Sequence, residues 1–139
     1  MRKFKRLTKI AKKLRSPTGC PWDRAQKLED MPEKLREEIE EVIQAIEKND
    51  SENLQEEIGD ILFVLILTAQ IAEEEGKLTM KDVLKGIEEK IISRHTWVFG
   101  KDKVKTPEEA LAQWKKNKEV EKAKKAAAAE SAANADNQV

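Results

Sequence analysis

Apolar residues recur along most of the chain at intervals of three and four, which is the spacing of one face of an α-helix. This pattern predicts a first helix over residues 3–14 and a second over residues 32–48. A third helix is expected to begin near Ser51, whose side chain can cap it, and to end at Gly76. The break between the second and third helices is short, so these two are expected to be antiparallel neighbours.

The second half of the chain shows two further helix starts. Thr79 and Asp82 form a cap-like pair before a fourth helix, and Thr106, Pro107 and Glu109 combine a cap, a first-turn proline and a capping-box acid. The expected buried face of the fourth helix consists of Met80, Val83, Leu84, Ile87, Ile91 and Ile92. No strand pattern or internal repeat is visible. The predicted fold class is therefore all-α, an antiparallel four-helix-type bundle with an additional C-terminal helix.

The segment "ILFVLILTA", residues 61–69, is apolar on every face of the predicted third helix. A helix of this kind belongs at the centre of a bundle or in a subunit interface. At nine residues the apolar run is too short to span a bilayer. We therefore expect the chain to form a dimer, a tetramer or another homo-oligomer.

Composition narrows the class of protein. The 139 residues include 27 basic and 27 acidic side chains, so no net charge directs the chain to nucleic acid or to a membrane. One cysteine and one histidine exclude an internal disulfide and a multi-histidine metal site. The basic, amphipathic N-terminus is expected to be a bundle helix, with a lipid-surface or targeting helix as the alternative. We expect a cytoplasmic protein with one domain over residues 1–120 and a low-complexity, frayed or disordered tail over 121–139.

Two pairs of acids flank the break between the second and third helices. Glu38 and Glu41 are three residues apart, as are Glu57 and Asp60, so each pair lies on one helix face. The pairs stand about 15 Å and about 13 Å from the break at 1.5 Å per residue, nearly level across an antiparallel hairpin. Converging carboxylates suit Mg²⁺, with Mn²⁺ as a substitute, and such ions recruit phosphates. The alternative is an ordinary solvated acidic surface.

Five motifs make the function more specific. The segments "GCPWD" (19–23), "EEIEE" (37–41), "EEIGD" (56–60), "AQIAEEEG" (69–76) and "RHTWVFG" (94–100) follow one another in a characteristic order. In order and spacing the chain resembles the MazG family of all-α nucleoside triphosphate pyrophosphohydrolases, from about residue 7 to about residue 118. The resemblance implies an enzyme that hydrolyses a nucleoside triphosphate to the monophosphate and pyrophosphate, in a helical dimer or higher assembly.

The resemblance also implies roles for individual residues. Mg²⁺ would be held by Glu38, Glu41, Glu57 and Asp60, with Glu37 as an additional candidate. Metal ions can neutralise the triphosphate and activate a water for in-line attack, and Glu37 or Glu38 is the candidate catalytic base. The substrate-binding candidates are Lys34, Lys90 and Arg94 for phosphate and Trp114 and Trp22 for the base. Both tryptophans have the alternative of core or interface anchors.

The chain departs from the family pattern in one motif. The common "RHPHVFG" reads "RHTWVFG" here, with Thr96 in place of a proline and Trp97 in place of a second histidine. Some relatives have a basic residue where this chain has Asn53. His95 is expected to be a cap or hydrogen-bonding group rather than the catalyst, and Cys20 a small buried residue. A non-catalytic nucleotide-binding or protein-interaction module is the alternative function. A di-iron site is excluded, because Ile92 stands where an ExxH motif needs glutamate.

Overall fold

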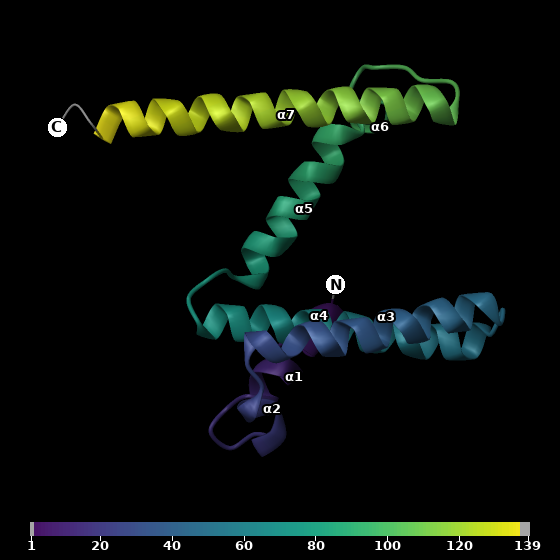
Figure 1. The fold of residues 1–139 in the computed structure, drawn as a ribbon, viewed down its shortest axis with the longest axis vertical. Helices are drawn as coiled ribbons and strands as arrows, with labels where there is room; N and C mark the ends of the chain where they lie inside the picture. Colours follow the sequence, from purple (N-terminus) through teal and green to yellow (C-terminus); the bar gives the residue numbers. More distant parts are fainter. Residues whose placement is uncertain (1, 137–139) are drawn as a thin grey trace. The chain divides into compact units, whose positions relative to one another are not determined.

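The computed structural model describes residues 2–136, and within this range the chain forms helices, turns and loops without a β-strand. The all-α prediction is confirmed (Figure 1). The elements are α1 (Arg2–Leu14), α2 (Pro21–Ala25), the 3₁₀ helix η1 (Leu28–Asp30), α3 (Met31–Glu47), α4 (Ser51–Glu74), α5 (Met80–Arg94), α6 (Thr96–Phe99) and α7 (Pro107–Asp136). Contacts divide the chain into two units, Met1–Val83 and Leu84–Val139, which are described separately.

The first unit is built around the hairpin of α3 and α4, which lie side by side as predicted (Figure 1). Met31, Leu67 and Ile71 form its apolar core, with Leu28 packed against them. The helix α1 also packs against α4 and buries Ala11. In this part of the chain the predicted helix limits agree with the structure within one or two residues, because apolar periodicity extends through each helix.

The helix ends explain where the chain turns. The predicted cap Ser51 is wrong, because the side chain of Asp50 accepts the Asn53 amide at 3.1 Å and Ser51 is the first helical residue. Gly76 has φ of 69°, which confirms the left-handed helix end. The Lys77 amide then donates to the Ala72 carbonyl at 2.9 Å, as a Schellman end requires.

The starts of α5 and α7 are confirmed as capping arrangements. The Thr79 amide donates to the Asp82 carboxylate at 3.2 Å, and the Asp82 amide donates to the Thr79 hydroxyl at 3.2 Å. At α7 the Glu109 amide donates to the Thr106 hydroxyl at 3.2 Å, while the Glu109 carboxylate accepts from the Lys105 amide at 2.7 Å. The capping acid therefore reaches one residue further back than a standard capping box.

The apolar faces of several helices are exposed in this single chain. The predicted buried face of α5 is wrong here, since Met80 is only partly buried and Val83, Leu84, Ile87, Ile91 and Ile92 are 42–47% exposed. On α3, Ile39, Ile43 and Ile46 are exposed as well. The spacing of apolar residues identifies an apolar face correctly but carries no information on what covers it. The segment 61–69 is likewise mixed, with Ile66 and Leu67 buried and Leu65 half exposed.

The helix α7 continues through the segment that was predicted to be a frayed tail. Residues 121–136 belong to this helix, and the rest of the predicted tail lies outside the described residues. The division into a domain over 1–120 and a tail over 121–139 stays a prediction. In the described part of the chain, no helix combines the length and the apolarity that a membrane crossing requires.

Candidate functional site

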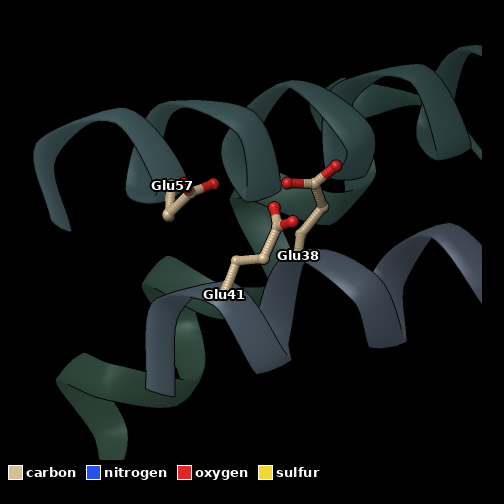
Figure 2. Close-up of side chains that lie close together, drawn as sticks. All are labelled: Glu38, Glu41 and Glu57. Carbon is tan, nitrogen blue, oxygen red and sulfur yellow. The ribbon is translucent and has the colours of Figure 1, made fainter. Parts of the chain in front are cut away.

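Three carboxylates from two helices converge in the first unit. Carboxylate oxygens of Glu38, Glu41 and Glu57 all lie within 4.8 Å of one another. Figure 2 shows Glu38 and Glu41 extending from α3 toward α4, which carries Glu57. The matched heights of the two acid pairs predicted the convergence of four carboxylates, and three of them meet here. The fourth predicted acid, Asp60, lies outside this group of mutually close oxygens but acts on it electrostatically.

The local sequence places Glu38 on the helix face that packs against α4. Met31 and Ala45, which are buried, lie seven residues before and after Glu38, and seven residues are close to two helical turns. Glu38 is therefore in line with the buried residues of α3, whereas the isoleucines that were expected to mark that face are more exposed. On α4, Glu57 is itself buried, with 8% of its surface exposed.

The environment makes ionisation of Glu38 unfavourable. Burial, followed by the negative charges of Asp60, Glu41 and Glu37, raises the pKa of Glu38 above its usual 4.5. Its Oε2 atom is buried and has no hydrogen-bond partner among the described residues. A buried carboxylate oxygen without a donor is a destabilising feature that a proton or a cation would relieve.

Glu57 is in the same situation. Burial first, then the charge of Glu41 and a hydrogen bond between the two carboxyl groups, raise the pKa of Glu57, and Asp60 and Glu56 add to this. Four further carboxylates thus act on Glu38 and Glu57 from both helices: Glu37, Glu41, Glu56 and Asp60. An all-oxygen donor set of this kind fits a hard divalent cation.

The loop before α3 presents an aromatic ring to solvent. Trp22 is 57% exposed, so its interpretation as a core residue is wrong for this chain by itself. The Lys34 ammonium lies 4.3 Å from the centroid of the Trp22 ring, a cation–π contact. Both side chains line a cavity of about 510 Å³ together with Gln26, Glu29, Asp30, Pro32, Glu33 and Arg36. The two sequence-predicted substrate residues of this unit are therefore in contact.

Arg15 fixes the segment before α3, a role that no sequence pattern predicts. Its guanidinium donates to the carbonyl of Asp23, to that of Gln26 at 3.0 Å, and to the Glu74 carboxylate at 2.7–2.8 Å. Burial alone raises the pKa of Glu74, but the hydrogen bonds from Arg15 and Gln70 bring it below its usual value. The Arg15 side chain is 9% exposed. A lone arginine between a helix and a proline-rich loop carries no periodic signal that would have identified it.

Gly19 allows the loop to turn back on α1. A Cβ atom at this position would collide with the carbonyl oxygens of Leu14 and Lys13. The adjacent Cys20 amide donates to the Leu14 carbonyl at 2.8 Å, which ties the loop to the helix end. The glycine of "GCPWD" is thus required by close backbone approach. Cys20 is partly buried rather than fully buried.

In the second unit, two of the predicted substrate-binding residues are also in contact with each other. The Arg94 guanidinium lies 5.0 Å from the centroid of the Trp114 ring and pairs with Glu121 at 2.9 Å. Trp114 lines a cavity of about 340 Å³ with His95, Trp97, Ala110 and Leu111. Lys90, one turn before Arg94, is exposed.

The single histidine has a structural partner in the same unit. Its Nδ1 atom lies 2.7 Å from the Ile91 carbonyl oxygen, which confirms the expectation of a hydrogen-bonding role. Its ring also lies 5.0 Å from that of Trp97, one of the two residues that depart from the family motif.

Fold and site together define an all-α protein that gathers carboxylates from two antiparallel helices. The family model "MazG nucleotide pyrophosphohydrolase domain" matches residues 26–99, more than half of the chain. The chain therefore belongs to the MazG family, and the resemblance drawn from its motifs is confirmed.

Individual relatives agree with this membership. A Thermotoga maritima protein named nucleoside triphosphate pyrophosphohydrolase/pyrophosphatase MazG is 43% identical over 88% of this chain and 46% of its own length. The nucleoside triphosphate pyrophosphohydrolase of Escherichia coli K12 is 38% identical over 91% of this chain and 48% of its own. A Bacillus subtilis protein, the uncharacterized YabN, is 41% identical over 86% of this chain and 24% of its own. The chain thus spans half or less of the length of these relatives.

A solved structure matches this chain over nearly the whole of its own length. The crystal structure of a mazG-related protein from Thermotoga maritima aligns with a TM-score of 0.71 and 38% identity. The alignment covers 83% of this chain and 98% of that one. The helical fold of this chain is therefore similar to that of an experimentally determined member of the family.

Proposed function

We propose that this chain hydrolyses nucleoside triphosphates, ribo- or deoxyribo-, to the nucleoside monophosphate and pyrophosphate. The observation that carries the proposal is the convergence of Glu38, Glu41 and Glu57 within 4.8 Å, with one buried carboxylate oxygen left without a donor. Membership of the MazG family and the names of the Thermotoga and Escherichia relatives support the same reaction. We further propose a house-cleaning role in the cytoplasmic nucleotide pool.

We propose Mg²⁺ as the cofactor, with Mn²⁺ as a substitute. Glu38, Glu41, Glu57 and Asp60 would hold it, since their oxygens are the donors that these ions prefer and their mutual repulsion falls when a cation binds. When bound, the cation supplies charge neutralisation for the triphosphate and a more acidic water. The orphaned Oε2 atom of Glu38 is the feature of this chain that most favours a cation over a solvated acidic surface.

The remaining groups would bind substrate or move a proton. Glu37, exposed beside Glu38, is a candidate base that takes a proton from the attacking water, and Glu38 is the other. In the second unit, Lys90 and Arg94 would donate charged hydrogen bonds to phosphate oxygens. Trp114, with an apolar cavity beside it, would contact the base.

Trp22 and Lys34 form the corresponding candidates in the first unit. The exposed face of Trp22 is available for stacking, and Lys34 is the cation nearest to it. The cavity that both residues line has mainly charged and amide side chains around it, which suits the polar parts of a nucleotide. We propose that this pair contributes to substrate binding rather than to the apolar core.

We also propose that the chain works as a homodimer or higher oligomer. Ile58, Leu62 and Leu65 on α4 recur at helical spacing and are 37–51% exposed. The parallel row on α3, Ile39, Ile43 and Ile46, is 41–59% exposed. Exposed apolar side chains in rows along a helical hairpin are typical of protein interfaces. No feature of the described residues indicates a nucleic-acid or membrane partner.

Product analysis tests the reaction directly. The chain is incubated with a panel of canonical and damaged dNTPs and NTPs, with Mg²⁺ or with EDTA, and the products are separated by chromatography. We expect monophosphate and pyrophosphate in equal amounts, and only with the metal. Diphosphate with orthophosphate would refute the reaction class, and no turnover of any nucleotide would favour a non-catalytic module.

A further inference from the structure

The face of α7 that meets Arg94 consists of residues that contact it in different ways. Trp114 presents its ring, with the centroid 5.0 Å from the guanidinium carbon. Asn117 donates from Nδ2 to the Arg94 carbonyl oxygen at 3.2 Å and to the Thr96 hydroxyl at 2.8 Å. Glu121 accepts from the Arg94 Nε at 2.9 Å. Positions 114, 117 and 121 follow the spacing of one helix face. This face therefore contacts Arg94 both at its backbone carbonyl and at its guanidinium.

The way in which Glu121 binds Arg94 leaves part of the guanidinium available. The carboxylate contacts Nε, the nitrogen nearest to the side-chain stem. This 2.9 Å contact is the shortest one between the two side chains, so Glu121 approaches the guanidinium from its stem side. The terminal nitrogens are the pair with which arginine binds a phosphate in two parallel hydrogen bonds.

The local charge remains positive despite this carboxylate. The other oxygen of Glu121 accepts from Lys125 at 2.8 Å, and the Lys118 ammonium lies 5.3 Å from the Trp114 ring centroid. Three cations, Arg94, Lys118 and Lys125, with two anions, Glu121 and Asp102, which accepts from the Thr96 hydroxyl at 2.6 Å, leave an excess of one positive charge. An approaching anion therefore meets a net positive surface, and the carboxylates do not cancel it.

We infer that Glu121 is a positioning residue: by binding Nε it holds the Arg94 guanidinium against Trp114, and the terminal nitrogens of Arg94 then bind a nucleotide phosphate. This inference rests on the proposed function of Arg94. An arginine side chain has many rotamers, and ordering it before substrate arrives lowers the entropy lost on binding. Arg94 is 12% and Glu121 18% exposed, so the pair is shielded more than a surface ion pair. The hydrogen bonds from Arg94 and Lys125 lower the pKa of Glu121 to about 2, and the carboxylate stays ionised at neutral pH.

The opposite possibility is that Glu121 competes with phosphate for Arg94. Positioning and competition predict opposite changes in KM for the Glu121→Gln variant. Positioning predicts a rise in KM of about three- to tenfold with kcat nearly unchanged, because an ordered binding group is lost without a change in the reacting atoms. Competition predicts a fall in KM. Glu119→Gln is the matched control, since Glu119 lies on the same helix, is 70% exposed and forms an ion pair with the exposed Lys122 rather than with Arg94.

A double-mutant cycle separates positioning from a role in folding. We expect Arg94→Ala to lower kcat/KM by about 10- to 100-fold, and Glu121→Gln to have no further effect on KM in that background. An equal effect of Glu121→Gln with and without Arg94, or no change in KM while only the melting temperature falls, would overturn the inference. Glu121→Asp keeps the charge on a shorter side chain and should give an intermediate KM.

Binding of inorganic triphosphate with Mg²⁺, measured by calorimetry, gives a readout that does not need turnover. We expect Glu121→Gln to weaken this binding by about the same factor as it raises KM. If the wild-type chain hydrolyses no nucleotide but binds triphosphate, and Glu121→Gln weakens that binding, the proposed reaction fails and the inference stands. If the wild-type chain releases pyrophosphate and Glu121→Gln changes neither KM nor triphosphate binding, the inference alone fails.

Discussion

At the scale of single residues, the most informative side chain is Glu38. It lies in line with the buried face of α3, and its Oε2 atom has no donor. We expect Glu38→Gln to reduce Mg²⁺-dependent pyrophosphate release by at least about 100-fold, because the change removes one charged metal ligand. The same variant should fold normally and melt at a higher temperature than the wild type in EDTA, since it removes like-charge repulsion. The measurements are product release and thermal melting followed by circular dichroism.

Glu40→Gln is the control for this substitution, because Glu40 lies two residues away, is exposed, and is absent from the cluster of close oxygens. Its activity and melting temperature should match those of the wild type. Near-full turnover by Glu38→Gln would contradict the metal assignment. A lower melting temperature in EDTA would show that Glu38 stabilises the apo fold instead.

The dependence on pH gives a second test of the same cluster. The pKa values of Glu38 and Glu57 are raised from 4.5, so between pH 4.5 and the raised values the folded state binds more protons than the unfolded state. Their contribution to stability is then present below pH 4.5 and is lost as the pH rises through the raised values. Glu74 and Glu121 have lowered pKa values and change stability below pH 4.5. Melting in EDTA from pH 4.5 to 7.5 should therefore fall more steeply for the wild type than for Glu57→Gln.

At the scale of helices, the residue that caps the start of α4 differs from the one that the sequence predicted. Asp50 caps this helix through the Asn53 amide. We expect Asp50→Ala to lower the free energy of unfolding by about 0.5–2 kcal/mol, the usual effect of losing a cap, in urea unfolding at constant metal concentration. Ser51→Ala is the matched control and should change it by less than about 0.5 kcal/mol. A larger loss of stability for Ser51→Ala than for Asp50→Ala would show that Ser51 is the cap.

Helix positions were predictable because apolar periodicity and capping residues are local properties of the sequence. The hairpin of α3 and α4 and the convergence of Glu38, Glu41 and Glu57 followed from helical spacing and a short break. The short elements α2, η1 and α6 were missed, since one turn is too brief to show a period. The contacts of Arg15 with Glu74 and of Arg94 with Glu121 were missed because they join residues 59 and 27 positions apart. Such pairings depend on packing, which a single sequence does not encode visibly.

At the scale of the whole molecule, the exposed apolar rows of α3 and α4 predict self-association. We expect light scattering to show at least a dimer at micromolar concentration. Leu65 is half exposed and belongs to the segment 61–69, which is the predicted interface. Leu65→Lys should raise the dissociation constant of the dimer by about tenfold or more. Association buries such side chains away from water, and a charge there opposes burial.

Glu52→Gln is the control for the change of charge. It alters the net charge by the same amount on the same helix, at an exposed position outside the apolar row. Its assembly should equal that of the wild type. A wild-type chain that scatters as a monomer at micromolar concentration would exclude the oligomer and leave the apolar rows unexplained.

The contacts of Arg15 have a consequence for how much the loop between α1 and α3 can vary in length. Surface loops ordinarily accept inserted or deleted residues, because few of their backbone groups have fixed partners. Here one side chain reaches two backbone carbonyls, those of Asp23 in α2 and of Gln26 just after it, and a carboxylate on α4. Gly19 packs against the end of α1. A single added residue between Gly19 and Gln26 would move at least one of these carbonyls out of reach. This segment should therefore tolerate insertions as poorly as the interior of a helix or strand does. The exposed ring of Trp22 is held at one position on the surface as a result.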